Sequence, residues 1–429
     1  MAARVSPFSI PAFRYYWFGR FASTIALNST VVILGWQVYD VARRTMSPRE
    51  AALQLGLIGV AQFLPLMLLT LVTGLAADKF DRRWIARGTT ALELLCAALL
   101  ALMTWRESVT LPALFAIAAL LGVARAFSGP ALQALSPNLV PKAILPAAIA
   151  TSSYAWQVGA IGGPALGGYL YAIDPPLAYA AGTGLLLFSL TMLMLIGPVQ
   201  RPERGEKRHP WVEMIEGFSY LRRNRLVLGA VSLDLFAVLL GGATAMLPVY
   251  ARDILHIGSS GLGHLRAAPA VGASVVAIWL SYFPLKYNVG LKLLVAVAVF
   301  GVGTIGFGFS YALPAPVMTA LACLFLLGAA DMVSVYVRQS LIQLYTPDSM
   351  RGRVGAASML FISCSNEMGE AESGFLAAAV GPVVAVVAGG IGTIAVAFLW
   401  VKLFPEILRA RTLDPPQSFD EIPSQEKPA

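Results

Sequence analysis

Long apolar blocks of similar length recur along the chain, separated by short stretches of polar, charged or turn-forming residues. A helix needs about 20 apolar residues to cross the hydrocarbon core of a bilayer. In hydrocarbon each helix must also satisfy its own backbone polar groups, so the pattern is typical of an all-α membrane protein. It predicts twelve transmembrane helices, at residues 16–41, 52–77, 85–105, 111–133, 144–172, 177–196, 226–250, 262–283, 291–311, 316–339, 354–380 and 383–404.

A long basic stretch divides these blocks into two groups of six, and a weak repeat links the groups. Because internal duplication of this kind underlies several transporter folds, we expect two pseudo-symmetric six-helix bundles. The repeat aligns Pro141 with Pro347, Gly163 with Gly369, and Gly168 with Gly374. The expected organisation is an N-terminal segment (1–15), a first bundle (16–196), a linker (197–225), a second bundle (226–404) and a disordered tail (405–429).

The distribution of Lys and Arg predicts the orientation of the chain. With the N-terminus inside, 22 of the 31 Lys and Arg residues fall on the inner side, 6 on the outer side and 3 within spans. Because cytoplasmic loops carry the excess of positive charge, we expect both termini in the cytoplasm. The net charge of +8 then reflects these loops, and no nucleic-acid partner is expected.

Composition excludes several other classes of protein. Apolar residues make up 57% of the chain and charged residues only 13%, whereas a soluble domain is nearer half and a quarter. The three cysteines are odd in number and far apart, so they indicate neither a disulfide nor a metal site. We find no HExxH, GxSxG or GxxxxGK[ST] motif, and therefore expect no enzyme, metal or cofactor. Energy must then come from an ion or substrate gradient.

The loop between the second and third spans reads Gly74-Leu-Ala-Ala-Asp78-Lys79-Phe-Asp81-Arg82-Arg83. It resembles the G-x-x-x-D-[RK]-x-G-[RK]-[RK] loop of the major facilitator superfamily, with Asp81 in place of the inner glycine. The resemblance implies a latch on the cytoplasmic gate, in which Asp78 faces the start of the eleventh span. The latch residues would be Gly74, Asp78, Arg82, Arg83, Arg351 and Arg353. The alternative is a simple positive loop.

The fifth span carries a second element of that superfamily. Gly159, Gly163 and Gly167 recur every four residues, so they share one helical face and form a groove for close packing. With Pro164 and Gly168 they are similar to the G-x-x-x-G-P-x-x-G-G element of its exporters. The resemblance implies export, and the alternative is ordinary small-residue packing.

Charged residues within the spans are candidates for proton coupling, because an ionisable group in hydrocarbon is costly and usually functional. Arg125, with Gly129 one turn on, is similar to an R-x-x-x-G element that the superfamily links to proton transfer. Glu367 and Glu370 share a helical face, and two poorly hydrated carboxylates so close repel each other when both ionise. Asp331 and Asp234 are further candidates. The alternative for the two glutamates is a structural hydrogen-bond network, or pairing with Arg125 or Arg338.

Two further segments, Gly263–Ala273 and Pro347–Val354, resemble the subgroup of the superfamily that holds siderophore and macrolide exporters. Polar and aromatic side chains within spans are candidates for the wall of a substrate cavity. Most aromatic residues in spans instead face lipid or pack internally. The candidates are Arg20, Asn28, Trp36, Phe63, Trp156, Phe236 and Asn366.

These observations predict a secondary active transporter. We expect a monomer that exports an amphiphilic small molecule, of siderophore or drug type, by proton antiport with alternating access. Its other partners would be protons and membrane lipids, and the resemblance implies the inner membrane of a bacterium. Import, facilitated diffusion or lipid flipping by the same fold is an alternative, and a non-transporting scaffold or receptor is another. Carboxylates at mid-span count against the scaffold, since a passive bundle has no reason to carry them.

Overall fold

A computed structural model gives the architecture of residues 6–79, 81–141, 144–198, 210–285 and 287–412. Within these ranges the description excludes a set of side chains, those of residues 70–79, 133–134, 137, 146, 150, 154, 210–214, 348–349, 351–352, 356, 359–360, 363–364 and 367. The described residues form helices and no strands.

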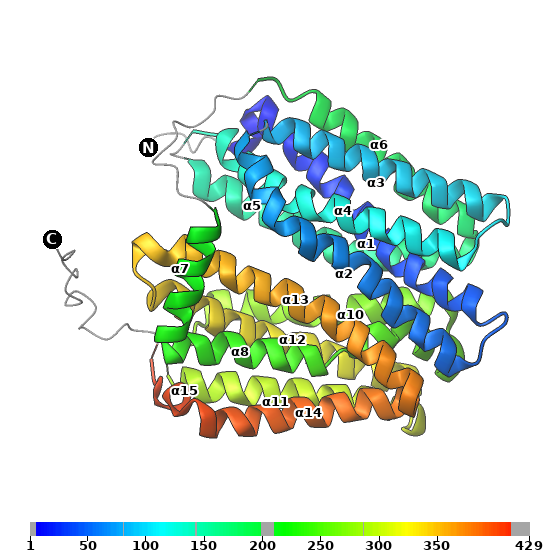
Figure 1. Cartoon of the computed structure of the whole chain (residues 1–429). Coiled ribbons are helices and arrows are strands. Elements are labelled where there is room, and N and C mark those ends of the chain that lie inside the picture. Colours follow the sequence, from blue (N-terminus) through cyan, green and yellow to red (C-terminus); the bar gives the residue numbers. More distant parts are fainter. Residues whose placement is uncertain (1–5, 80, 142–143, 199–209, 286, 413–429) are drawn as a thin grey trace.

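Six long helices make up the first half of the chain (Figure 1). Proline, whose fixed φ suits a first helical turn, is the first residue of three of them, at Pro11, Pro48 and Pro175. The first two helices begin four or five residues before the apolar blocks expected at 16–41 and 52–77. The helices are α1 (Pro11–Ala42), α2 (Pro48–Lys79), α3 (Arg82–Trp105), α4 (Leu111–Leu135), α5 (Leu145–Ile173) and α6 (Pro175–Met194). Two 3₁₀ turns, η1 (Pro7–Ser9) and η2 (Ser136–Asn138), accompany them.

The second half has the same number of spans over its described residues, but its first span is broken. It begins as α8 (Arg225–Leu240) and continues after Gly241 and Gly242 as η4 (Ala243–Met246), α9 (Leu247–Val249) and the π-helix η5 (Tyr250–Ile254). The remaining elements are α10 (Gly258–Tyr282), α11 (Val289–Gly308), the 3₁₀ turn η6 (Ser310–Ala312), α12 (Pro316–Leu344), α13 (Asp348–Val380) and α14 (Pro382–Leu403).

The break in this span differs from the continuous helix expected at 226–250. A Cβ at Gly242 would lie 2.5 Å from the carbonyl oxygen of Gly369, so only glycine fits where the chain meets α13. The 3₁₀ turn η4 follows directly. Close approach to α13 therefore accompanies the loss of regular α-helix at this point.

Two short helices lie where the sequence pattern predicted none. Helix α7 (Pro210–Arg223) occupies part of the linker, and Phe218 packs edge-on against Phe361 of α13. Helix α15 (Pro405–Arg409) opens the tail that we expected to be disordered. Its Glu406 accepts a 2.8 Å hydrogen bond from Arg225, and Ile407 is fully buried. These contacts order the first residues of the tail.

By length and composition, ten helical segments among the described residues qualify as membrane spans. The two long helices that complete the expected twelve are α5 and α13. Many large apolar side chains remain exposed on the helices of both halves, including Leu68, Val384 and Phe398, each more than half exposed. Such a surface suits lipid, because a soluble protein rarely exposes so much contiguous apolar area.

Glycine contacts reveal the pseudo-symmetry of the two halves. Gly163 of α5 lies against the Ile25 carbonyl of α1, and its repeat partner Gly369 of α13 lies against the Val238 carbonyl of α8. Because α1 and α8 are the first spans of their halves, the two contacts are equivalent. The other aligned pair is equivalent too. Gly168 meets Gly263 of α10, and Gly374 meets Gly56 of α2, each across the boundary between the halves.

The two bundles converge toward the end at which α1, α3 and α5 finish, which we call the distal end (Figure 1). They diverge toward the opposite, terminal end, where α1 begins and α14 finishes. At the distal end Asp253 accepts hydrogen bonds from the Tyr39 hydroxyl (2.6 Å) and the Arg43 guanidinium (2.8 Å). Arg252 forms an ion pair with Asp40 at 2.7 Å. These contacts join α1 to η5 and close the distal end.

Candidate functional site

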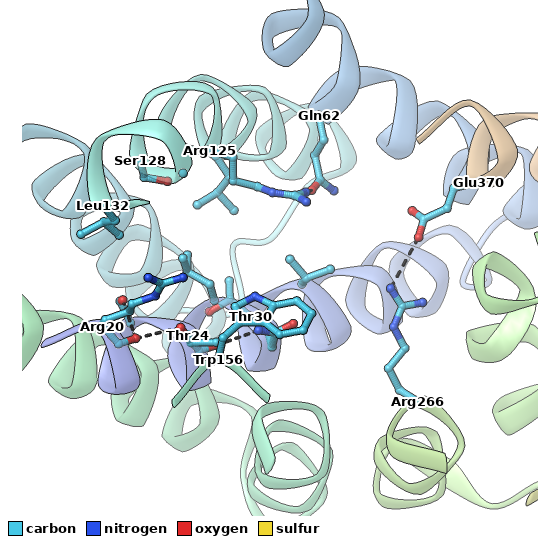
Figure 2. A pocket seen from close by; sticks show the side chains of 16 residues that line it. Arg20, Thr24, Thr30, Gln62, Arg125, Ser128, Leu132, Trp156, Arg266 and Glu370 are labelled. Carbon is cyan, nitrogen blue, oxygen red and sulfur yellow. Dashed lines mark hydrogen bonds and ion pairs between the residues drawn. The ribbon is translucent and has the colours of Figure 1, made fainter. Parts of the chain in front are cut away.

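A cavity of about 380 Å³ lies between the two halves, and most of its wall comes from the first (Figure 2). Its volume falls within the range of sites for small organic molecules. The wall is mixed in character, with several charged and hydroxyl-bearing side chains. Its lining residues are Arg20, Ser23, Thr24, Leu27, Asn28, Thr30, Val31, Gln62, Leu121, Arg125, Ser128, Gly129, Leu132, Trp156, Arg266 and Glu370.

One face of α1 supplies the polar part of this wall. Arg20, Thr24 and Asn28 recur every four residues and therefore lie in one row along the helix. The row is fixed by local hydrogen bonds. The Thr24 hydroxyl donates to the Arg20 carbonyl at 2.8 Å, and the Asn28 amide donates to the Thr24 carbonyl at 2.8 Å. Arg20 itself donates to the Tyr16 hydroxyl at 2.6 Å.

The glycine stripe of α5 sets α1 in position behind this row. A Cβ at Gly159 would lie 2.7 Å from the Thr24 Cγ2, and one at Gly163 would lie 2.8 Å from the Ile25 carbonyl oxygen. Gly167 meets Ser29 in the same way, whereas Gly168 faces α10. The predicted close-packing groove is therefore present, and α1 occupies it. The helix continues through Pro164, whose carbonyl faces Gly263.

Arg125 of α4 points toward Gln62 of α2, and its guanidinium donates to the Gln62 side-chain oxygen at 3.4 Å (Figure 2). Behind this wall, Glu93 of α3 is only 1% exposed. It forms a hydrogen bond with Ser128 and lies near Arg125. The first half thus holds a buried acid close to the cavity arginine.

Glu370 of α13 and Arg266 of α10 face each other at the distal side of the cavity, 3.5 Å apart (Figure 2). Arg266 also donates to the Thr244 carbonyl at 3.2 Å, in the broken part of the seventh span. Both charged side chains line a second cavity of about 50 Å³ that continues toward the distal end. One arginine therefore connects α10, α13 and η4 at the point where the cavity narrows.

A second group of charges lies inside the other bundle, away from the central cavity. Asp234 of α8 forms an ion pair with Arg338 of α12, and both are at least 94% buried. Asp331, which lies two turns before Arg338 on α12, lines the same small void as Asp234 and Ser334. The two aspartates therefore lie close together in the interior of the second half, and Asp234 is the one paired with Arg338.

The predicted latch residues are only partly within the described side chains. Gly74, Asp78 and Arg351 lie outside them. Arg83 binds the Asp81 carboxylate at 2.5 Å, and Asp81 caps α3 by accepting from the Arg83 backbone amide at 3.0 Å. The aspartate that replaces the glycine of the motif is thus a helix cap.

Arg353, at the other side of the predicted latch, forms an ion pair with Glu216 of α7 at 2.6 Å. Arg82 also has a polar partner. The arginine at the start of the eleventh span is therefore joined to the linker helix α7 in this state.

Three of the predicted cavity residues, Arg20, Asn28 and Trp156, line the central cavity. Trp36 is instead buried in the hydrophobic core of the distal end, and Phe236 packs against Trp400. Phe63 is half-buried on α2, and Asn366 is exposed on α13. The side chain of Glu367 lies outside the described residues.

Sequence reasoning missed two central residues of the site. Arg266 lies four residues inside the span expected at 262–283, and the charge count assigns it to the outer side, but α10 begins eight residues before it and carries it into the wall. Gln62 lines both cavities and is uncharged, so it gives no signal in a pattern of hydropathy and charge. A charge one or two turns inside a span was the signal available for Arg266.

Comparison with known families places the chain. The profile of the family described as transmembrane secretion effectors matches residues 2–426. The chain belongs to this family, which is part of the major facilitator superfamily. Its relatives include enterobactin exporters called EntS. That of Citrobacter koseri is 28% identical over 428 residues, and the match covers 96% of each chain. That of Escherichia coli O127:H6 is 27% identical over 415 residues and 94% of each chain.

Solved structures agree on the fold of this transmembrane secretion effector. A bacterial homologue of the human lysosomal transporter Spinster, in an inward-facing and unoccupied conformation, has a TM-score of 0.71 at 14% identity and covers 92% of this chain and 97% of its own. A D-xylose–proton symporter has a TM-score of 0.69 at 14% identity and covers 94% and 99%. The protein is a multi-span membrane transporter and not an enzyme.

Proposed function

We propose that this transporter exports an amphiphilic small molecule from the bacterial cytoplasm by proton antiport. The observation that carries the proposal is the Arg266–Glu370 pair, which lies where the central cavity narrows toward the closed distal end. A carboxylate at that place can be reached from the cavity and also holds together the elements that close it. The family and the named activity of the relatives support a transporter with this direction.

The orientation proposed from the positive charges makes the terminal end cytoplasmic. The present state, closed at the distal end by Tyr39, Arg43 and Asp253, is then inward-facing. In this state ionised Glu370 attracts Arg266, and that attraction holds α10 and α13, the two helices of the second half that pack against the first, in a fixed position relative to each other. Opening toward the outside requires the distal contacts to separate.

Protonation of Glu370 supplies the coupling step in this proposal. A neutral carboxyl group loses most of its attraction for Arg266, and Arg266 also anchors η4 through the Thr244 carbonyl. In the outward-facing state Glu370 gains a proton, the halves rock back, and the proton leaves to the cytoplasm as the ion pair re-forms. One proton moving down 100 mV provides about 2.3 kcal/mol, which supports more than tenfold accumulation of cargo.

The other predicted coupling residues fit supporting roles in the same cycle. Asp234 pairs with Arg338 and shares a small void with Asp331, so two carboxylates lie near one guanidinium, and a proton on either aspartate would neutralise the group. Arg125 faces the cavity and has the buried acid Glu93 behind it. Glu367, one turn before Glu370, is the second member of the predicted proton-carrying pair.

Transport into proteoliposomes tests the proposal, with enterobactin as the first cargo because the relatives are named for it. An acidic lumen should drive accumulation if cargo and proton exchange, whereas an acidic exterior would drive it in a symporter. We expect Glu370→Gln combined with Glu367→Gln to abolish accumulation and to leave downhill exchange in place. Glu107→Gln, which alters an exposed loop carboxylate, is the control. Unchanged uphill transport in the double variant would refute the coupling role.

A further inference from the structure

The charges around the central cavity are unequal. Among the described lining residues are three guanidinium groups, those of Arg20, Arg125 and Arg266, and one carboxylate, that of Glu370. The carboxylate is engaged by Arg266 at the distal side. The part of the wall made by α1 and α4 therefore presents positive charge to anything that enters the cavity.

Arg20 is the most informative of these groups. Its guanidinium donates to the Tyr16 hydroxyl at 2.6 Å, and the Tyr16 hydroxyl donates in turn to the Leu132 carbonyl at 3.0 Å. Both partners are neutral. Within the described part of the chain no carboxylate forms an ion pair with Arg20. A cation held in a span without an opposite charge is costly and usually serves a ligand or an ion.

Charged and polar groups on the neighbouring helices leave the net charge of this wall positive. From α3, Glu93 approaches Arg125, but it is 1% exposed and stands behind Ser128, out of reach of a ligand. From α2 comes the neutral amide of Gln62. The charge of Arg125 is therefore partly balanced by Glu93. The charge of Arg20 can be balanced by a negatively charged ligand in the cavity.

An aromatic surface lies in the same wall. Trp156 of α5 lines the cavity and remains 53% exposed, so its ring is available to stack on a planar group. Next to it, the Gln157 amide donates to the Ser274 hydroxyl at 2.7 Å across the boundary between the halves, which fixes this part of α5. Aromatic rings of a protein and of a ligand pack with an offset or edge-on geometry that adds to apolar burial.

We propose that the cargo is an aromatic organic anion, whose carboxylate or other oxyanion binds Arg20 and whose ring packs on Trp156. The inference rests on the proposed export function and narrows its cargo. A guanidinium suits this task because its planar array of donors matches the two oxygens of a carboxylate. The cavity of about 380 Å³ suits a free small molecule, and the headgroup of an anionic lipid has the same charge chemistry.

Binding of matched probes tests the sign of the charge. The full-length protein is placed in nanodiscs of zwitterionic phosphatidylcholine, and 1-naphthoate, 1-naphthamide and 1-naphthylmethylammonium are titrated by calorimetry. The three probes share one ring and differ in charge. We expect naphthoate to bind at least tenfold more tightly than the ammonium probe. Equal or tighter binding of the ammonium probe would overturn the proposal.

Substitutions of Arg20 test whether this residue is the one that binds the anion. Arg20→Gln should weaken naphthoate binding by roughly ten- to a hundredfold, as expected for loss of a charge-assisted hydrogen bond, and should leave naphthamide within about threefold. Arg20→Lys should restore part of the loss. Arg14→Gln removes the same charge from an exposed position of the same helix and should have no effect. Unchanged naphthoate binding in Arg20→Gln would overturn the proposal.

The source of the anion is tested by changing the lipid. If naphthoate binds equally in nanodiscs of phosphatidylglycerol and phosphatidylcholine, the site takes a free organic acid. If phosphatidylglycerol abolishes naphthoate binding, a lipid headgroup occupies Arg20, and the assignment to a soluble cargo is overturned. Failure here is distinct from failure of export, because uphill transport driven by a pH gradient can persist with a cargo of another charge.

Discussion

At the scale of single residues, substitution of two adjacent glycines of α5 by alanine should have opposite effects on stability. A methyl group at Gly163 would lie 2.8 Å from the Ile25 carbonyl oxygen, whereas one at Gly162 would meet nothing within 4 Å. We expect Gly163→Ala to cost about 1–3 kcal/mol through overpacking of α1 against α5. Thermal unfolding in detergent measures the effect.

The neighbouring variant Gly162→Ala serves as the matched control for this prediction. It should keep or slightly raise the midpoint of unfolding, because alanine favours a helix by up to about 1 kcal/mol over glycine. Equal destabilisation by the two substitutions would show that the helix contact is not the cause.

How far single residues were predictable depends on what each contributes to the pattern. A charged or large aromatic side chain within an apolar block is easy to recognise in the sequence. Three such residues, Arg20, Trp156 and Glu370, line the cavity. Trp36 has the same features and is part of the core. Hydropathy cannot separate these cases, because the face of a helix that meets the cavity is set by packing against several other helices.

At the scale of elements, the start of α2 is a capping box with a defined pH response. The Ser47 amide donates to the Glu50 carboxylate at 2.8 Å, and the Glu50 amide donates to the Ser47 hydroxyl at 3.3 Å. The backbone hydrogen bond from Ser47 holds the pKa of Glu50 below its ordinary value of 4.5. The ionised form is therefore the one that stabilises the cap.

The sign of the pH dependence follows from this lowered pKa. The cap contributes fully above pH 4.5 and is lost as the pH falls through the lower folded value. Hydrogen-exchange protection of the Ser47 and Glu50 amides should fall over that range. Glu50→Gln keeps an acceptor at the same position and should remove the pH dependence. Protection that falls with pH in both proteins would disprove the assignment.

Elements were more predictable than residues, with one informative exception. All twelve apolar blocks lie in helices, and ten of the described helical segments also qualify as membrane spans by length and composition, because a helix satisfies its own backbone polar groups in a bilayer. The seventh span is broken after Gly241 and Gly242, and its sequence is as apolar as its neighbours. Its break coincides with a close contact to α13, and a contact between helices so far apart in the sequence cannot be predicted from the local hydropathy pattern.

At the scale of the whole molecule, Asp253 makes two of the contacts that join the halves at the distal end. It accepts hydrogen bonds from Tyr39 and Arg43, both in the opposite half. We expect Asp253→Asn to raise the population open at the distal end, because the charge that attracts Arg43 is removed. Spin labels at Ser108 and Ala312, exposed near the distal ends of the two halves, would report longer distances.

A control for this prediction comes from the same charge cluster. Arg44 is 67% exposed, follows the end of α1 and pairs with Asp40 four residues before it, in the same half of the protein. Arg44→Gln removes a charge from this end without breaking a contact between the halves, and the distance distribution should not change. A distribution that is the same in Asp253→Asn and in the unaltered protein would refute the closing role.

The global symmetry was predictable from a few residues, and the conformational state was not. Three aligned pairs suggested the duplication, and two of them occupy equivalent helix contacts. The closed distal end depends on pairs such as Arg252 and Asp40, which are 212 positions apart and belong to different halves. A transporter has at least two such arrangements of similar free energy, and a sequence encodes both.

The bare backbone contacts between the halves have a practical consequence. Where Gly56 lies on Gly374 and Gly168 on Gly263, the surfaces are smooth, and they can part without disengaging interlocked side chains. Gly374→Leu should prevent α13 from packing closely against α2, because the leucine side chain would collide with the backbone at Gly56. Such a variant should favour the conformation that is open at the distal end, which would make that conformation accessible to structure determination.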